Sequence, residues 1–287
     1  MYTLIISIAC SVAVSVLLKL ARRKSIHIDQ AIAVNYLVAA SLSLLIFQPS
    51  PTSLVSPSTP WWVLGALGVL LPTIFLAMAG AVRHAGIVLS DAAQRLSLFI
   101  PLIAAFVLFG ETATTGKLAG ISLALVALAC LLSRKNTQTS TGETGKTVSL
   151  LLAVWLGYGT IDILFKQLAK SGAAFSSSLF VAFALAGILI FLFLLTRRTV
   201  WTRRSLVAGL VLGVLNFGNI YFYIRAHQVF PQNPTLVFSA MNIGVISLGT
   251  VVGAGIFKEK LSWVNALGIA LAVAAIVALI PRETVSP

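Results

Sequence analysis

The chain has 287 residues, of which 59% are hydrophobic and only 9% are charged, and its mean hydropathy is +1.02. Soluble globular proteins carry about 25% charged residues, so this composition excludes a water-soluble globular domain. The formal net charge of +13 does not indicate nucleic-acid binding, because Lys and Arg occur in short clusters between apolar runs and form no basic domain. The sequence therefore predicts a membrane protein.

Apolar runs follow one another along nearly the whole chain, and each is long enough to cross a hydrocarbon core about 30 Å thick. The predicted fold is an all-α membrane protein with ten transmembrane helices. We expect them at residues 2–20, 30–47, 61–82, 86–109, 116–133, 147–168, 175–195, 205–226, 234–257 and 262–280. The first run lacks a basic segment before it and a small-residue cleavage motif after it, so we interpret it as a helix and not as a signal peptide.

The polar stretch Arg134–Lys146 divides the chain nearly in half, and the two halves resemble each other. An offset of 148 positions aligns Phe109 with Phe257, Glu111 with Glu259, Gly120 with Gly268 and Ile121 with Ile269. We expect a five-helix repeat at residues 1–135, a linker at 136–146 and a second five-helix repeat at 147–283. Because five is an odd number, the two copies must have opposite orientations. Secondary transporters use this inverted-repeat arrangement.

A ten-span chain in which Glu closes the fourth span of each half, followed by a Gly-rich fifth span, resembles the EamA-type transporters of the drug/metabolite transporter (DMT) superfamily. The best local matches are Pro101 with Phe109-Gly110-Glu111 in the first half, and Phe257-Lys258-Glu259-Lys260 with Gly268 in the second. The resemblance covers essentially the whole chain. It implies the fold and a transport function, leaves the substrate open, and implies a structural role for Glu111 and Glu259. The sequence departs from the family at Gly249, which stands where the first half has Pro101.

The positive charges predict an orientation in the membrane. If the spans alternate, fourteen Lys and Arg residues lie beside the loops after spans 1, 3, 5, 7 and 9, and five lie on the other side. Cytoplasmic loops carry the excess of Lys and Arg, so we expect an inner-membrane protein with both termini external. Members of the family more often keep both termini inside.

The fourth predicted span holds the most informative residues. Arg95 lies nine residues after Gly86, which places it about 14 Å along a helix and close to the midplane. A charge there costs at least about 2.5–3.5 kcal/mol, and such residues normally face a cavity or pair internally. Asp91 precedes Arg95 by four residues on the same helix face, and Gln94 is adjacent. Two interpretations stay open: a substrate site, or a closed Asp91–Arg95 pair that fixes helix packing.

The second half adds further polar residues near the predicted midplane. The predicted substrate-binding set is Arg95, Asp91, Gln94, Asn242, Asn216, Asn219, Tyr158 and Asp162. Lys166 follows Asp162 by four positions, and Asn35 and Tyr36 are weaker candidates. The alternative role for each Asn is an ordinary hydrogen bond between helices.

These observations predict a secondary carrier, either an exporter or an exchanger. It would move a small metabolite such as an amino acid or organic anion by alternating access around a cavity between the repeats. The alternatives are a multidrug or cation efflux carrier, a channel, a membrane scaffold and an intramembrane enzyme. The sequence has no G-x-x-x-x-G-K-[ST] motif and no recognisable set of catalytic residues, so we expect no enzymatic activity, metal or cofactor. The expected partners are the substrate and the bilayer, and the protein is expected to be a monomer or homodimer.

Overall fold

The computed structural model describes residues 1–23, 26–49, 59–132, 144–170, 175–197, 199–257 and 262–280. All regular elements in these segments are α-helices, as the sequence predicted. They are α1 (Tyr2–Arg23), α2 (Ile28–Phe47), α4 (Trp61–Leu96), α5 (Phe99–Val107), α6 (Thr115–Leu132), α7 (Thr144–Ala169), α8 (Phe175–Thr196), α9 (Arg203–Val229), α10 (Pro234–Phe257) and α11 (Trp263–Leu279).

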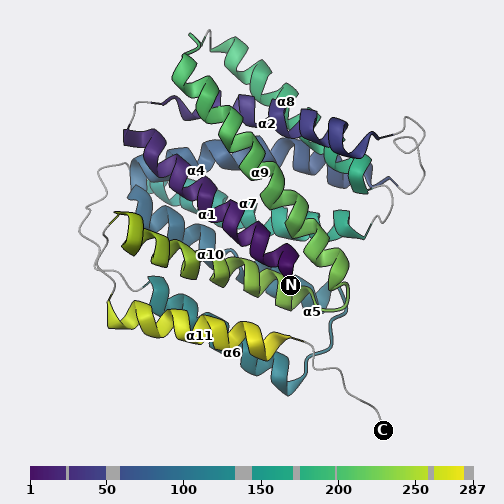
Figure 1. Ribbon diagram of the computed structural model, residues 1–287, viewed down its shortest axis with the longest axis vertical. Helices are drawn as coiled ribbons and strands as arrows, with labels where there is room; N and C mark the ends of the chain where they lie inside the picture. Colours follow the sequence, from purple (N-terminus) through teal and green to yellow (C-terminus); the bar gives the residue numbers. More distant parts are fainter. Residues whose placement is uncertain are drawn as a thin grey trace.

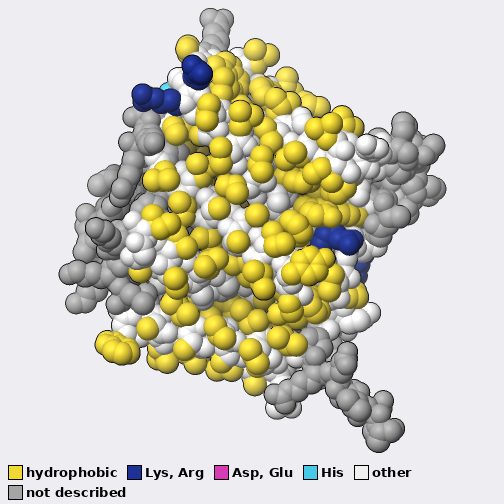
Figure 2. All heavy atoms as spheres, viewed as in Figure 1, with side chains coloured by type: hydrophobic (Ala, Val, Ile, Leu, Met, Phe, Trp, Pro, Cys, Tyr) yellow, Lys and Arg dark blue, Asp and Glu magenta, His cyan; other side chains and the backbone are white. Residues whose placement is uncertain are grey.

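Among the described segments, six are long and apolar enough to cross a membrane. They are Ile28–Phe47, Trp61–Ala85, Gly145–Ala169, Phe175–Thr196, Arg203–Val229 and Pro234–Ile256. Many large apolar side chains on these segments are exposed, including Leu45, Trp62 and Leu195. Figure 2 shows apolar side chains across one face of the molecule, with Lys and Arg only near two opposite edges. This distribution suits a protein embedded in a bilayer.

Four of the ten predicted spans correspond to shorter apolar helices: Tyr2–Leu18, Ala92–Val107, Thr115–Leu131 and Trp263–Leu279. A helix of 17 residues such as α11 is about 26 Å long, slightly less than a hydrocarbon core of about 30 Å. Length and composition therefore identify six spans, and the remaining four stay a prediction.

The predicted boundary between the third and fourth spans, at residues 82–86, falls inside α4. The helical residues of α4 run from Trp61 to Leu96, and a further break separates α4 from α5. Pro101 explains this position. It is the third residue of α5, within the first turn, where a backbone N–H has no partner inside the helix.

The chain nevertheless reverses direction within this region. Ile74 of α4 packs against Gly157 of α7, and Ile100 of α5 packs against Gly159, only two residues further along α7. A straight helix would separate positions 74 and 100 by about 39 Å. The segment must therefore fold back between Ile74 and Ile100, so that both of its arms contact α7.

The helices pack as a bundle with two distinct edges. In Figure 1, α2 and α8 lie at one edge, and α6 and α11 lie at the opposite edge. Between these edges α1 packs on α9 and α10, while α7 packs on α4 and α5. In addition, α2 packs on α9, and α4 packs on α8. The largest buried apolar cluster fills the centre and includes Leu67, Phe183 and Phe238.

The helices α6 and α11 approach each other closely through two glycines. A Cβ atom placed on Gly120 would lie 2.7 Å from Leu279, and one placed on Gly268 would lie 2.8 Å from Leu131. Position 120 of α6 thus meets 279 of α11, and position 131 meets 268, so the two helices are antiparallel. Small residues at such contacts let two helix backbones come close together.

Candidate functional site

Arg95 lies at the helix break in the first half. It is in the last turn of α4, one turn before α5 begins, and its side chain is buried, with 9% exposure. Ser97 stabilises this end of the helix, because its Oγ donates a hydrogen bond to the Gln94 carbonyl oxygen at 2.6 Å. From α7, Trp155 Nε1 donates to the Leu96 carbonyl oxygen at 3.1 Å. The carbonyl groups that the break leaves without helical partners are thereby partly satisfied.

Asp162 of α7 is the centre of the polar contacts near Arg95. The Tyr223 hydroxyl, on α9, donates a hydrogen bond to Asp162 Oδ1 at 3.0 Å. The Asn242 side chain, on α10, also interacts with the Asp162 carboxylate, and so does the positive charge of Arg95. Four helices, α4, α7, α9 and α10, therefore each contribute one polar side chain. We call Arg95, Asp162, Tyr223 and Asn242 the central polar cluster.

The chemistry of this cluster suits a ligand that carries both acceptors and donors. A guanidinium has five donors arranged to bind a carboxylate or phosphate in a bidentate way. A carboxylate accepts hydrogen bonds or pairs with a cation. Ionisable groups at membrane depth are rare and mark substrate or ion pathways, which makes Arg95 and Asp162 the strongest functional candidates in the described part of the chain.

The other asparagines differ in their surroundings. The Ser7 hydroxyl, on α1, donates to Asn219 Oδ1 at 3.0 Å and contacts the Asn219 carbonyl oxygen at 2.9 Å, so Asn219 links α1 to α9. Asn216 is 4% exposed, and its Nδ2 has no hydrogen-bond partner among the described residues. Asn242 Nδ2 donates to the Phe238 carbonyl oxygen of its own helix at 3.2 Å. Asn219 thus fits the packing alternative, whereas Asn216 has an amide available for a ligand.

Tyr158 is half-buried on α7 and lies within electrostatic reach of Tyr36 of α2. Tyr36 is fully buried with its ring edge-on to Phe75, at a centroid distance of 6.5 Å. Its hydroxyl and both amide atoms of Asn35 have no hydrogen-bond partner in the described structure. Buried polar groups are normally satisfied, so this second polar region, at Asn35 and Tyr36, also has capacity for a ligand or water.

The remaining predicted residues are less informative. The side chain of Asp91 lies outside what the structure describes, so the predicted Asp91–Arg95 pair stays a prediction. Gln94 is half-buried beside Arg95. Lys166 does not pair with Asp162; its Nζ donates to the Pro231 carbonyl oxygen at 2.7 Å.

Sequence reasoning missed Tyr223 and Ser7. Tyr223 follows Asn219 by four positions and Asn216 by seven, so helical periodicity places the three on one side of α9. That spacing could have identified Tyr223. No sequence signal points to Ser7, because a lone serine in an apolar helix is common and its contact with Asn219 depends on tertiary packing.

A hollow of about 340 Å³ lies away from these residues, at the C-terminal end of α8. Its lining is mostly apolar and consists of Phe191, Leu194, Leu195, Thr199 and Trp201. None of the predicted site residues contributes to it. The predicted cavity around Arg95 therefore stays a prediction.

No family model matches the chain. A protein of Haemophilus influenzae, described as uncharacterized, is 52% identical to it over 284 residues, which cover 97% of each chain. The chain belongs to the family of this Haemophilus influenzae protein. Since the match covers almost all of both sequences, the family shares the whole set of helices and not a single segment.

A solved structure shows the same fold. A protein known from its crystal structure superposes with a TM-score of 0.74 over 97% of this chain and 95% of its own, at 15% sequence identity. At this identity the likeness concerns the fold alone.

Proposed function

We propose that this chain is a secondary carrier, an exporter or exchanger of a small metabolite such as an amino acid or organic anion, of the EamA type in the DMT superfamily. The observation that carries the proposal is the central polar cluster. In this cluster the charge of Arg95, from the first half, acts on the Asp162 carboxyl group of the second half, inside a bundle with an apolar surface. A site shared by both halves is what alternating access requires.

The packing of the helices supports the two-repeat architecture of the proposal. If α4 and α5 together form the third and fourth spans, then in chain order α1 matches α7, α2 matches α8, α4 matches α9 and α5 matches α10. The contact of α1 with α9 then corresponds to that of α7 with α4. The contact of α1 with α10 likewise corresponds to that of α7 with α5, and α2 with α9 to α8 with α4. The antiparallel, reciprocal contact of α6 with α11 fits an axis perpendicular to these helices, and hence in the membrane plane.

The break between α4 and α5 supports the location of the site. Carriers with inverted repeats often bind substrate at discontinuous helices near the midplane, where helix ends meet the ligand. Arg95 lies in the last turn before this break. In the second half, α10 runs unbroken from Pro234 to Phe257, so the two copies differ at this point.

A second candidate is a cation efflux carrier, and Asp162 favours it. A half-buried carboxylate that accepts a hydrogen bond from Tyr223 is a natural partner for an ammonium group. The positive charge of Arg95 close to Asp162 opposes a simple cation site. We therefore rank the metabolite carrier first.

The proposal is tested with purified protein in two steps. A thermal-shift screen of amino acids, organic acids, sugars and quaternary ammonium compounds identifies a ligand. Uptake of the labelled ligand into proteoliposomes should then saturate with concentration and be inhibited by unlabelled ligand. Flux that rises linearly without saturation would indicate a channel, and the absence of flux for any stabilising compound would indicate a scaffold. Stabilisation by quaternary ammonium compounds alone would favour the second candidate.

A further inference from the structure

The turn Phe109-Gly110-Glu111 ends α5 with a defined geometry. The Phe109 N–H donates to the Ala104 carbonyl oxygen at 3.0 Å, and the Glu111 N–H donates to the Ala105 carbonyl oxygen at 3.0 Å. Gly110 has a φ of +67°, a left-handed conformation that glycine adopts without steric cost. This turn directs the Glu111 side chain away from α5 and toward the second half of the chain.

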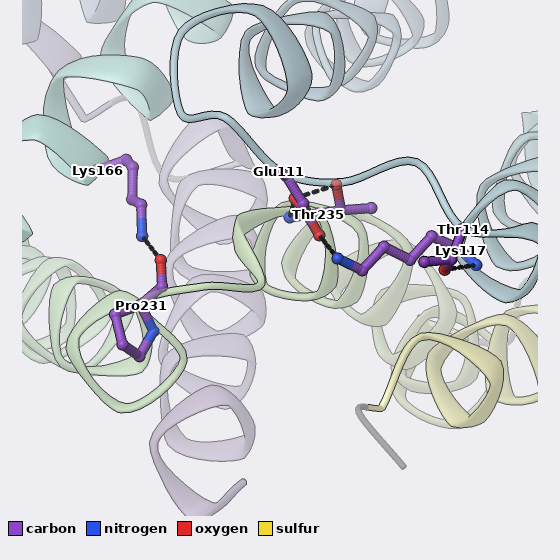
Figure 3. Close-up of polar contacts among 6 residues, drawn as sticks. All are labelled: Glu111, Thr114, Lys117, Lys166, Pro231 and Thr235. Atoms are coloured by element: carbon purple, nitrogen blue, oxygen red, sulfur yellow. Dashed lines mark hydrogen bonds and ion pairs between the residues drawn. The ribbon is translucent and has the colours of Figure 1, made fainter. Parts of the chain in front are cut away.

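Glu111 binds the first turn of α10. Its Oε2 accepts hydrogen bonds from the Thr235 N–H at 2.9 Å and from the Thr235 hydroxyl at 2.6 Å (Figure 3). Its Oε1 lies 3.1 Å from Lys117 Nζ in an ion pair. The N–H groups in a first helical turn lack helical partners, and a carboxylate there is favoured by the helix dipole. A residue of the first half thus caps a helix of the second half.

The same turn also contacts α7. The ring of Phe109 lies under two ammonium groups, with its centroid 5.9 Å from Lys166 Nζ and 4.8 Å from Lys170 Nζ. Lys166 in turn holds the Pro231 carbonyl oxygen just before α10, as Figure 3 shows. The turn therefore joins α7 and α10. Lys166 is 2% exposed and Thr235 is fully buried, whereas Lys170 is exposed.

Polar side chains connect this turn with the central polar cluster on three helices. On α10 they are Thr235, Ser239 and Asn242; on α9 they are His227 and Tyr223; on α7 they are Lys166 and Asp162. Successive members on each helix are three or four residues apart, which places them on one face. Ser239 Oγ and both ring nitrogens of His227 are buried and have no hydrogen-bond partner among the described residues. Such groups need an explanation, and water or ligand that enters from this end would satisfy them.

We propose that this line of side chains is an access route to the central polar cluster, and that the Phe109-Gly110-Glu111 turn is the latch that closes it. The latch rests on the proposed carrier function, because alternating access requires this end to open in one state. Opening breaks the contacts of Glu111 with Thr235 and moves Phe109 away from Lys166 and Lys170. The contacts of Glu111 with Thr235 are polar and lie at a helix end, where water can replace them.

The latch is tested by cysteine accessibility in the purified full-length protein. The background carries Cys10→Ser and Cys130→Ala, and Ser239→Cys is the reporter because Ser239 is fully buried between Thr235 and Asn242. The rate of modification by a water-soluble methanethiosulfonate reagent is measured. We expect Glu111→Gln to raise this rate about tenfold or more, and Thr235→Val, which keeps the N–H and loses the hydroxyl, to raise it less.

The matched control reporter is Ser205→Cys. Ser205 lies at the start of α9, the end away from His227 and the latch, and it is as fully buried as Ser239. Its rate should stay the same or fall in the Glu111→Gln protein. Equal increases in the modification rate at both reporters would mean that Glu111 only stabilises the fold. An unchanged rate at Ser239→Cys would mean that Glu111 holds no gate. Either result overturns the latch. The modification rate is measured without substrate, so the latch and the carrier function are tested separately. Saturable wild-type flux together with an unchanged modification rate of Ser239→Cys in the Glu111→Gln protein would reject the latch and keep the carrier. Absent wild-type flux would reject the carrier instead.

Discussion

Gly268 of α11 lies 148 positions after Gly120 of α6, and each glycine faces a leucine on the other's helix. Gly120 faces Leu279, and Gly268 faces Leu131, which are themselves 148 positions apart. The offset that aligns the two halves of the sequence thus reappears as a reciprocal contact in space. Such reciprocity arises naturally when two copies of one unit pack about a two-fold axis.

This contact predicts the cost of adding a methyl group at each glycine. We expect Gly268→Ala to destabilise the protein by about 1–3 kcal/mol through overpacking, because the new Cβ would lie 3.1 Å from the Leu131 backbone nitrogen. Gly120→Ala should cost less, since its nearest neighbours belong to the Leu279 side chain. Thermal unfolding in detergent measures both.

The control for these variants is Gly116→Ala, also on α6. A Cβ at Gly116 would meet nothing within 4 Å, so this change should be neutral or stabilise the helix by up to about 1 kcal/mol. Equal destabilisation by all three variants would show that the loss of glycine itself matters and that the close contact of α6 with α11 does not.

The hydrogen bond from Tyr223 to Asp162 predicts a loss of transport without a loss of folding. Tyr223→Phe removes the hydroxyl and retains the ring contacts with Phe165 and His227. A hydrogen bond to a charged group contributes about 1.5–3 kcal/mol, so we expect the uptake efficiency to fall about tenfold or more. Tyr221→Phe, whose ring packs on Phe217, is the matched control and should transport like the wild type. Equal activity of the two variants would remove Tyr223 from the site.

Arg95 should be sensitive to the shape of its charged group as well as to its charge. If it binds an anionic group, Arg95→Lys should weaken transport less than Arg95→Ala, and neither should reach wild-type rates, because Lys lacks the bidentate fork. Arg225→Ala is the control: Arg225 is exposed, and its guanidinium binds Gln228 of the same helix. Full transport by Arg95→Ala with normal expression would exclude a substrate role for Arg95.

Much of the fold could be predicted from the sequence, because apolar runs and charge clusters are local signals. The extent of α4 past residues 82–86 could not, because the fold-back between Ile74 and Ile100 depends on how both residues pack on α7. For the site, Arg95 and Asp162 stand out in the sequence as charged residues within apolar runs. The neighbours were not: the contact of Tyr223 with Asp162 and that of Glu111 with Thr235 join residues 61 and 124 positions apart.

The charge bias predicts the orientation in the membrane, which cysteine labelling checks. In a protein without its native cysteines, Ala113→Cys in the exposed loop before α6 should react with an impermeant maleimide in intact cells. Val200→Cys, at a residue that is 82% exposed before α9, should react only after permeabilisation. The opposite pattern would show that the orientation usual in the resembled family holds here as well.

The central claim is that one site, shared by the two halves, faces each side of the membrane in turn. Counterflow in proteoliposomes measures this directly: vesicles are loaded with an excess of the unlabelled ligand from the thermal-shift screen, and entry of the labelled ligand is followed. We expect transient accumulation above the equilibrium level in the wild type, and little or none in Arg95→Ala or Asp162→Asn proteins that fold normally. Wild-type entry that only rises to the equilibrium level, unaffected by the internal ligand, would contradict the account.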